Sequence, residues 1–267
     1  MRPPDNARAA GWDCHIHVFD PAYPAQAGHY RPVLRDLPEI EQAAATLGVG
    51  HLVLVQPSVY GTDNTLMLSA LAREAGRHRG VAVVDTAATD AELDHMHRLG
   101  VRGVRFNRVS PVGNGPEAFH TLAPRLKARG WHVQWYAHAH QLDAIADLHE
   151  GSGLTAVLDH LAGLHAGIGQ HDPAWAALQR LAEQGAWVKL SGGYRLQASA
   201  PYDTLHANIR RVAQTMGDRL VWGSDWPHTA FPPEAMPRYD SVWHPVVQAL
   251  GAARAAAVRA AGALLYA

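Results

Sequence analysis

The sequence contains one cysteine, Cys14, in 267 residues. An intramolecular disulfide and every zinc motif built from several cysteines are therefore excluded. The chain also has no excess of charge of either sign, since 23 Lys and Arg nearly balance 24 Asp and Glu and leave a net charge of −1. Without a basic run, general binding to nucleic acid or to an anionic membrane surface is not expected.

Long apolar segments are missing as well. No apolar run approaches the roughly 18 residues that a membrane-spanning helix needs. The first dozen residues, MRPPDNARAAGW, lack the apolar segment of a secretory signal. We therefore expect no membrane partner and a cytoplasmic location. Hydrophobic residues still make up 48% of the chain, which is enough for one folded domain over residues 1–267. The composition leaves a homo-oligomer open.

Short apolar runs of β-strand type recur along the whole chain, about 30 residues apart on average. The stretches between them have the features of helices, because six of them end at a glycine suited to the C-terminal cap position. An alanine-rich helix is predicted over 252–267. The predicted strands cover residues 13–18, 51–56, 80–85, 101–106, 131–136, 154–159, 186–191 and 220–225.

Eight strands that alternate with eight helices predict a (β/α)8 barrel, the TIM-barrel fold. A doubly wound open sheet is the rival, but it usually has fewer strands, and no G-x-G-x-x-G motif follows the first predicted strand. In a (β/α)8 barrel the chemistry lies at the C-terminal ends of the strands. Those ends are therefore where functional residues are expected.

Two histidines lie in the first predicted strand, which reads DCHIHV. Because side chains alternate along a strand, His15 and His17 are expected to share one face with Asp13, and Cys14 the other. Two imidazoles on one face can bind a metal ion or stabilise an anion. The pair is also compatible with two hydrogen-bonded structural histidines. Cys14 is expected to be a buried apolar filler.

Further polar side chains follow the other predicted strands. Asp225 ends the eighth, where a carboxylate can accept a proton from water, bind a metal or cap the following turn. Arg105 is in phase with the inward positions of the fourth strand, whereas Arg108 has the opposite phase. The other residues expected at this rim are Tyr136 and His138 after the fifth strand, His160 after the sixth and Arg195 after the seventh.

Six segments, in order along the chain, resemble the amidohydrolase-2 branch of the amidohydrolase superfamily. They are DCHIHVFDP, QPSVYGTDN, GVRGVRFN, LDHLAG, VKLSGGYR and VWGSDWPH. No single segment is decisive, but the ordered set covers the chain from the first strand to the eighth. The resemblance implies a (β/α)8 barrel that acts on the ester bond of a carboxylated lactone, either 2-pyrone-dicarboxylate-like or derived from a sugar acid.

The resemblance also implies roles for individual residues. Asp225 would be the general base for water, and the arginines would hold substrate carboxylates with their planar guanidinium groups. The implied catalytic residues are Asp225, His15, His17, His160 and Tyr136. The expected substrate-binding residues are Arg105, Arg195, Ser58, Tyr60, Asn107 and His228.

One position departs from the dicarboxylate-specific members of this branch. They have a further arginine shortly after the fourth-strand motif, where this sequence has Pro111. Arg108 has the wrong phase for a simple replacement. One carboxylate contact is therefore expected to be missing. A substrate with fewer carboxylates or more hydroxyls, such as a sugar-acid lactone, is favoured, because the QPSVYGTDN loop offers groups that bind hydroxyls.

The residues bear on metal content as well. A binuclear site is not expected, because the fixed charge of Arg105 at the end of the fourth strand would repel a second cation. A single zinc or manganese ion would have enough ligands in His15, His17, Asp225 and either His138 or His160. The resemblance, with tyrosine at the fifth strand and arginine at the fourth, implies that no metal is required. We expect no obligatory cofactor.

Lactone hydrolysis by Asp225-activated water is the leading functional prediction. The same residues would serve a sugar-acid lactone isomerase, in which a substrate hydroxyl replaces water as the nucleophile. A metal-dependent decarboxylase of the same superfamily is another alternative. The non-enzyme alternative is a sugar-acid binding protein that lost the chemistry, and no feature of the sequence favours it.

Overall fold

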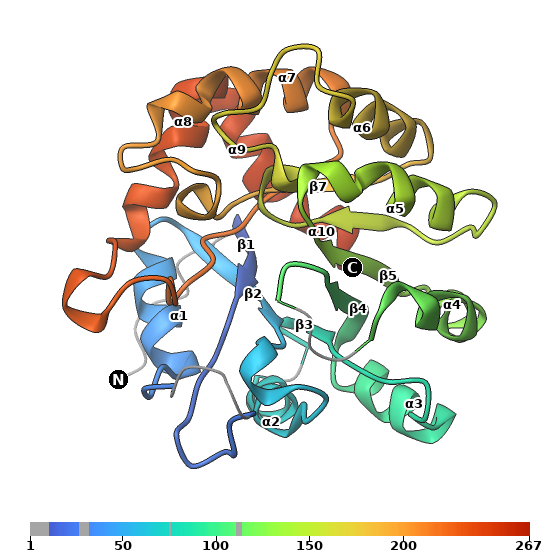
Figure 1. Cartoon of the computed structure of the whole chain (residues 1–267). Coiled ribbons are helices and arrows are strands. Elements are labelled where there is room, and N and C mark those ends of the chain that lie inside the picture. The colour runs from blue at the N-terminus through green and yellow to red at the C-terminus, as the bar shows by residue number, and fades with distance from the viewer. Residues whose placement is uncertain (1–10, 27–31, 75, 111–113) are drawn as a thin grey trace.

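The computed structural model describes residues 11–26, 32–74, 76–110 and 114–267. Within them, eight parallel strands form one sheet whose order follows the chain from β1 to β8. The helices lie outside this ring of strands, as Figure 1 shows. The strands are β1 (Gly11–Ile16), β2 (Val49–Val55), β3 (Arg79–Ala82), β4 (Val101–Asn107), β5 (His132–Tyr136), β6 (Ala156–Leu158), β7 (Trp187–Leu190) and β8 (Leu220–Trp222).

This arrangement confirms the predicted (β/α)8 barrel. Each strand overlaps its predicted range, and the boundaries differ by a few residues, as is usual for element ends. The most consequential differences are that β6 ends at Leu158 and β8 at Trp222. Asp159 and Asp225 therefore lie in the loops directly after these strands, on the side of the barrel where chemistry is expected.

The helices between the strands also follow the predicted order. α1 begins after Asp36, whose side chain accepts a hydrogen bond from the backbone N–H of Glu39 at 3.0 Å. α3 begins with a capping box formed by Thr89 and Glu92. The helices up to β8 are α1 (Leu37–Ala45), α2 (Thr65–Arg73), α3 (Asp90–Arg98), α4 (Phe119–Ala128), α5 (Leu142–His149), α6 (Ala174–Glu183) and α7 (His206–Met216).

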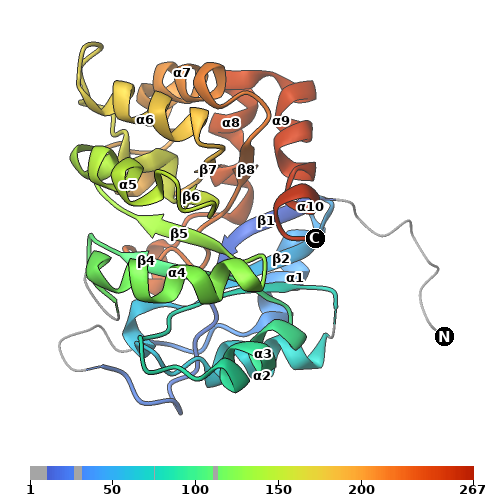
Figure 2. The same ribbon diagram turned by 90° about the vertical axis from the view of Figure 1, so that its right-hand side faces the viewer.

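The C-terminal region differs from the prediction. The sequence pattern does not predict α8 (His244–Leu250), because this helix is only seven residues long and lacks the extended periodicity that identifies a helix. The single helix predicted over 252–267 is two, α9 (Ala252–Ala260) and α10 (Gly262–Leu265). Beyond α10, the ring of Tyr266 stacks 6.1 Å from that of Trp12. Figure 2 shows the C-terminus beside the ends at which the strands begin.

The contact between β1 and β8 closes the barrel and sets the geometry of the site. The backbone N–H of Asp225 donates to the carbonyl of His15 at 2.9 Å, and the N–H of His17 donates to the carbonyl of Trp226 at 2.9 Å. Gly223 makes this approach possible, since a Cβ there would lie 2.6 Å from the Cβ of His15. Asp225 is thereby held against both histidines of β1.

The predicted alternation along β1 is wrong at its first positions. The pairing of β1 with β2 shifts register between Asp13 and Ile16, as in a β-bulge. The Asp13 carboxylate does not join the histidine rings but accepts hydrogen bonds from the backbone of Ser224 and the hydroxyl of Tyr239, both at 2.9 Å, and from the backbone N–H of His15 at 3.1 Å. Cys14 is fully buried in an apolar cluster with Val53, Val55, Val81 and Val221, which agrees with its predicted role as a filler.

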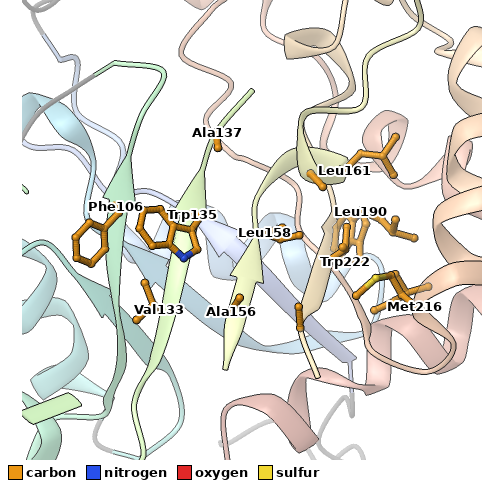
Figure 3. Packing of buried hydrophobic residues seen from close by; sticks show 14 of the residues in the cluster. Phe106, Val133, Trp135, Ala137, Ala156, Leu158, Leu161, Leu190, Met216 and Trp222 are labelled. Atoms are coloured by element: carbon orange, nitrogen blue, oxygen red, sulfur yellow. The ribbon is translucent and has the colours of Figure 1, made fainter. Parts of the chain in front are cut away.

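The main apolar core lies between the strands and the surrounding helices. Figure 3 shows part of it, with Phe106 of β4, Trp135 of β5 and Trp222 of β8 among the labelled side chains. The indole N–H of Trp135 donates to His149 of α5 at 2.8 Å, so even the polar atom of this ring has a partner. Among the described residues, no helix is both long and apolar enough to cross a membrane.

Candidate active site

Asp225 is the centre of a buried polar cluster at the C-terminal ends of the strands. Its carboxylate is fully buried, and its two oxygens have different surroundings. Oδ2 accepts hydrogen bonds from the Tyr194 hydroxyl at 2.5 Å and from Nε of Arg195 at 2.6 Å. Oδ1 has no hydrogen-bond partner among the described residues. The Nε2 atoms of His17 and His15 lie 3.4 and 3.6 Å from it.

The remaining contacts of the three histidines fix how each ring is turned. Nδ1 of His17 donates to the backbone carbonyl of Val55 at 2.7 Å, which leaves Nε2 of this ring facing Asp225. Nδ1 of His15 lies 3.2 Å from the carboxylate of Asp159.

His160 begins a short 3-10 turn, η4 (His160–Gly163), with a positive φ of 48°. Oγ of Ser191 accepts a hydrogen bond from the backbone N–H of His160 at 3.3 Å and lies 3.0 Å from Nδ1 of its ring. Nε2 of His160 is 4.0 Å from Oδ2 of Asp225.

Burial and charge set the protonation of these groups. Burial lowers the pKa of His15 well below its usual value and that of His160 to about 4. Burial alone would raise the pKa of Asp225, but the charge of Arg195 outweighs it and holds that pKa well below its usual value. At neutral pH the site therefore combines an ionised Asp225 with neutral rings at His15 and His160.

Arg105 and Tyr136 flank the cluster, as the phase of β4 and the end of β5 predicted. Nε of Arg105 lies 3.3 Å from Oδ2 of Asp159. The guanidinium groups of Arg105 and Arg195 lie 5.3 and 5.9 Å from the centre of the Tyr136 ring. The edge of that ring faces His160, with 4.8 Å between the ring centres. Burial raises the pKa of Tyr136, so its phenol stays protonated and can donate a hydrogen bond.

The other predicted substrate-binding residues occupy different places. Nδ2 of Asn107 donates to Oγ of Ser58 at 2.7 Å, which joins the loops after β2 and β4. His228 is buried beside Tyr194, with ring centres 5.8 Å apart. The hydroxyl of Tyr60 instead donates to the backbone carbonyl of Asp20 at 2.9 Å and accepts from its N–H at 3.0 Å. Tyr60 is thus not brought to the cluster.

Two residues weighed from the sequence lie apart from the site, and a third is not among the described residues. His138 is exposed and stacks on His140, with 5.6 Å between the ring centres, so it does not join the other candidate metal ligands. Arg108 lines a surface hollow with His120 of α4 and Asp147 of α5, which is the outward direction that its phase predicted. Pro111 lies outside the described residues.

Sequence reasoning missed four residues of the site. Asp159 immediately precedes His160 in the LDHLAG segment, and Tyr194 immediately precedes Arg195. Gln134 and Lys189 are fully buried polar residues in β5 and β7. The available signal was a polar side chain in an otherwise apolar strand. Such a residue is seldom left buried without a partner.

His15, His160 and Asp225 could together hold one metal ion. One ligand atom of each lies within 4.8 Å of the others. Nε2 of both histidines and Oδ1 of Asp225 are buried and have no hydrogen-bond partner within the described part of the chain. Two imidazole nitrogens and a carboxylate oxygen are a donor set that zinc accepts. The residues present therefore fit a single divalent ion.

Comparisons with known proteins identify the family of this chain. The 2-pyrone-4,6-dicarboxylate hydrolase of Comamonas testosteroni is 32% identical over 85% of this chain and 80% of its own length. The 4-sulfomuconolactone hydrolase of Rhizobium radiobacter is 31% identical over 85% of this chain and 79% of its own. The structure of a proposed 2-pyrone-4,6-dicarboxylic acid hydrolase from Pseudomonas putida superimposes with a TM-score of 0.85 at 31% identity, covering 96% of this chain and 97% of that one. The amidohydrolase family model matches residues 12–259. The chain therefore belongs to the amidohydrolase family and is an enzyme of that family.

Proposed function

We propose that this enzyme hydrolyses the ester bond of a carboxylated lactone, with Asp225 as the base that activates water. One observation carries the proposal. Both hydrogen bonds to the Asp225 carboxylate fall on Oδ2, while Oδ1 is buried among imidazole nitrogens and unpaired within the described residues. Oδ1 is therefore a fixed proton acceptor, to which a reacting water could donate. The lactone hydrolases among the relatives support the choice of substrate class.

The three imidazoles have different parts in this proposal. Nε2 of His15 and Nε2 of His17 both face Oδ1, so one of them can accept a hydrogen bond from the water proton that Asp225 does not remove. The Ser191 hydroxyl accepts a hydrogen bond from the backbone N–H of His160 and can donate one to Nδ1 of the ring. Nδ1 is then the unprotonated nitrogen, and the proton of the neutral ring is on Nε2. His160 and the phenol of Tyr136 are therefore the donors that would stabilise negative charge on the carbonyl oxygen.

The proposed reaction balances within this set of groups. Asp225 removes a proton from water as the water oxygen bonds to the lactone carbonyl carbon. The ring C–O bond then breaks, and Asp225 returns the proton to the departing oxygen. The products are a new carboxylic acid, ionised at neutral pH, and a hydroxyl. If a divalent ion were held by His15, His160 and Asp225, Nε2 of His160 would be a ligand and no longer a donor, and the ion would supply Lewis-acid polarisation of the carbonyl in its place.

Arg195 and Arg105 are proposed to hold the substrate carboxylate. Nε of Arg195 donates to Asp225, and its Nη2 donates to Oγ1 of Thr229 at 3.2 Å. Nε of Arg105 donates to Asp159. The outer nitrogens of Arg105 and Nη1 of Arg195 are proposed to bind the planar anion. The Ser58 and Asn107 pair supplies hydroxyl-binding groups, which suits a sugar-acid lactone.

The test is a panel of carboxylated lactones, each paired with its methyl ester, assayed with the wild-type enzyme and Asp225→Asn. We expect the acids to be hydrolysed far faster than their esters, because only the acids can pair with the guanidinium groups. Asp225→Asn should lose about 10²–10⁴-fold in kcat, the usual contribution of a general base. Asp147→Asn, at an exposed carboxylate that pairs with Arg180, is the matched control.

Two results would reject the proposal. One is that no lactone in the panel is turned over. The other is that Asp225→Asn keeps more than a tenth of the wild-type kcat while its circular dichroism and melting temperature match those of the wild type.

A further inference from the structure

Arg195 has a hydrogen-bond partner to which the proposed function gives no role. Its Nε donates to Asp225 at 2.6 Å, but its Nη2 donates to Oγ1 of Thr229 at 3.2 Å. Thr229 lies in the loop that follows β8 and is partly buried, whereas the next residue, Ala230, is exposed. Thr229 therefore lies at the outer edge of the site, beside a guanidinium group that is proposed to bind the substrate carboxylate.

We propose that Thr229 is a specificity-determining residue whose hydroxyl donates a hydrogen bond to the substrate carboxylate that Arg195 holds. The ligand is the carboxylate of a lactone, so the inference rests on the proposed function and extends it to a residue without an assigned role. The segment VWGSDWPH, on which the family resemblance partly depends, ends at His228, one residue before Thr229. The contact with Arg195 is what points to this position.

The direction of the hydrogen bond between Arg195 and Thr229 carries the argument. A guanidinium group can only donate, so Oγ1 of Thr229 must be the acceptor in this contact. The hydroxyl proton of Thr229 then points away from Nη2, and it has no acceptor among the described residues. Thr229 thus has one donor to offer to a ligand, and the matching group on the ligand must be an acceptor such as a carboxylate oxygen.

The loop that carries Thr229 is fixed on both sides of it. The backbone N–H groups of His228 and Phe231 each donate to the carbonyl three residues earlier, at 2.9 Å. The rings of His228 and Phe231 also pack edge-on against Tyr194, with 5.8 and 5.1 Å between the ring centres. Because Tyr194 immediately precedes Arg195, these contacts hold the Thr229 hydroxyl in place relative to the guanidinium group.

A hydroxyl in this position distinguishes ligands by their charge. Hydrogen bonds to an ionised acceptor are roughly twice as strong as those between neutral groups. A methyl ester keeps the carbonyl oxygen of the acid but loses the negative charge. The Thr229 hydroxyl should therefore strengthen the binding of a carboxylated lactone more than the binding of its ester.

The test compares Thr229→Val with Thr229→Ser on carboxylated lactones and their methyl esters. Valine has nearly the shape of threonine but no hydroxyl, whereas serine keeps the hydroxyl. We expect Thr229→Val to raise KM for the acids by about 10–100-fold, the usual effect of losing a hydrogen bond to a charged group, with kcat nearly unchanged. The acid-to-ester ratio of kcat/KM should fall by about fivefold or more in Thr229→Val and stay close to the wild-type ratio in Thr229→Ser.

A double variant separates contact with the substrate from an effect exerted through Arg195. If Thr229 acted only by holding Nη2, Thr229→Val would change nothing further in Arg195→Met. If its hydroxyl meets the carboxylate, Thr229→Val should still lower the acid-to-ester ratio by about threefold or more in that background. Thr46→Val is the matched control and should behave as the wild type, because the Thr46 hydroxyl is exposed and donates to the Ala43 carbonyl.

Three kinetic results would overturn the inference, each in variants whose melting temperature matches that of the wild type. They are equal losses on acids and esters in Thr229→Val, a Thr229→Ser variant as impaired as Thr229→Val, and no further effect of Thr229→Val in Arg195→Met.

A binding measurement decides the inference if the wild type turns over no lactone, in which case the proposed function itself has failed. The probe is citrate, titrated by calorimetry, with uncharged triethyl citrate as its control. We expect the wild type to bind citrate about tenfold or more tightly than Thr229→Val, with no such difference for triethyl citrate. A wild type that binds citrate no more tightly than Thr229→Val would overturn the inference.

Discussion

The stability of this barrel should depend on pH through His132, a histidine that takes no part in the proposed chemistry. His132 lies in β5 with its ring buried against Tyr266, 5.2 Å between ring centres. Gly103 of β4 makes room for it, since a Cβ there would lie 2.5 Å from Nε2 of the ring. Burial, followed by the positive charge of Lys189, lowers the pKa of His132 to about 3.

The sign and size of the effect follow from this pKa. In the unfolded chain a histidine takes up a proton near pH 6.5, whereas native His132 stays neutral down to about 3. Protons therefore favour the unfolded state increasingly as the pH falls from about 6.5 toward 3. Between pH 7 and pH 5 this single ring should lower the free energy of unfolding by about 2 kcal/mol.

The assay is urea denaturation of the wild type and His132→Gln at pH 7, 6 and 5. Comparing the two pH dependences cancels any constant cost of the substitution. His132→Gln should lose about 2 kcal/mol less than the wild type between pH 7 and 5. His138→Gln, at an exposed histidine, is the control and should follow the wild type. Identical pH dependences for His132→Gln and the wild type would refute the reasoning.

Three other substitutions or treatments have defined outcomes. Arg195→Met should reduce kcat/KM on a carboxylated lactone at least tenfold more than on its methyl ester; equal losses would remove Arg195 from carboxylate binding. Dialysis against a chelator should leave the rate within about twofold, because three cationic side chains already face the carboxylates of Asp159 and Asp225. An inactive protein that zinc restores would contradict this. Gly103→Ala should destabilise the fold by about 1–3 kcal/mol through its clash with His132, measured by urea denaturation, and unchanged stability would argue against the packing described.

The fold could be predicted from the sequence because its signals are local. Each strand carries its own apolar run, and each helix up to α7 carries its own start or stop residues. The errors in the fold prediction have local causes as well. The register shift between Asp13 and Ile16 breaks the alternation on which face assignments rest. α8 is too short to show a period, and Pro245 lies in its first turn.

The site was harder to predict, because its contacts join residues far apart in the chain. His138 and His160 both follow a strand, yet of the two it is His160 that meets Asp225. His160 has a left-handed backbone, with a φ of 48°, that no residue pattern predicted. Asp159 was missed because its importance depends on Lys189 and Gln134, which reach it from two other strands. The roles of the individual site residues stay predictions until the variants are measured.

The most direct test of the central claim is a single turnover of an accepted lactone in water enriched in oxygen-18. If Asp225 activates water, one labelled oxygen enters the new carboxylate of each product molecule formed. An unlabelled product would contradict the account, since the ring would then have been opened by a hydroxyl of the substrate itself.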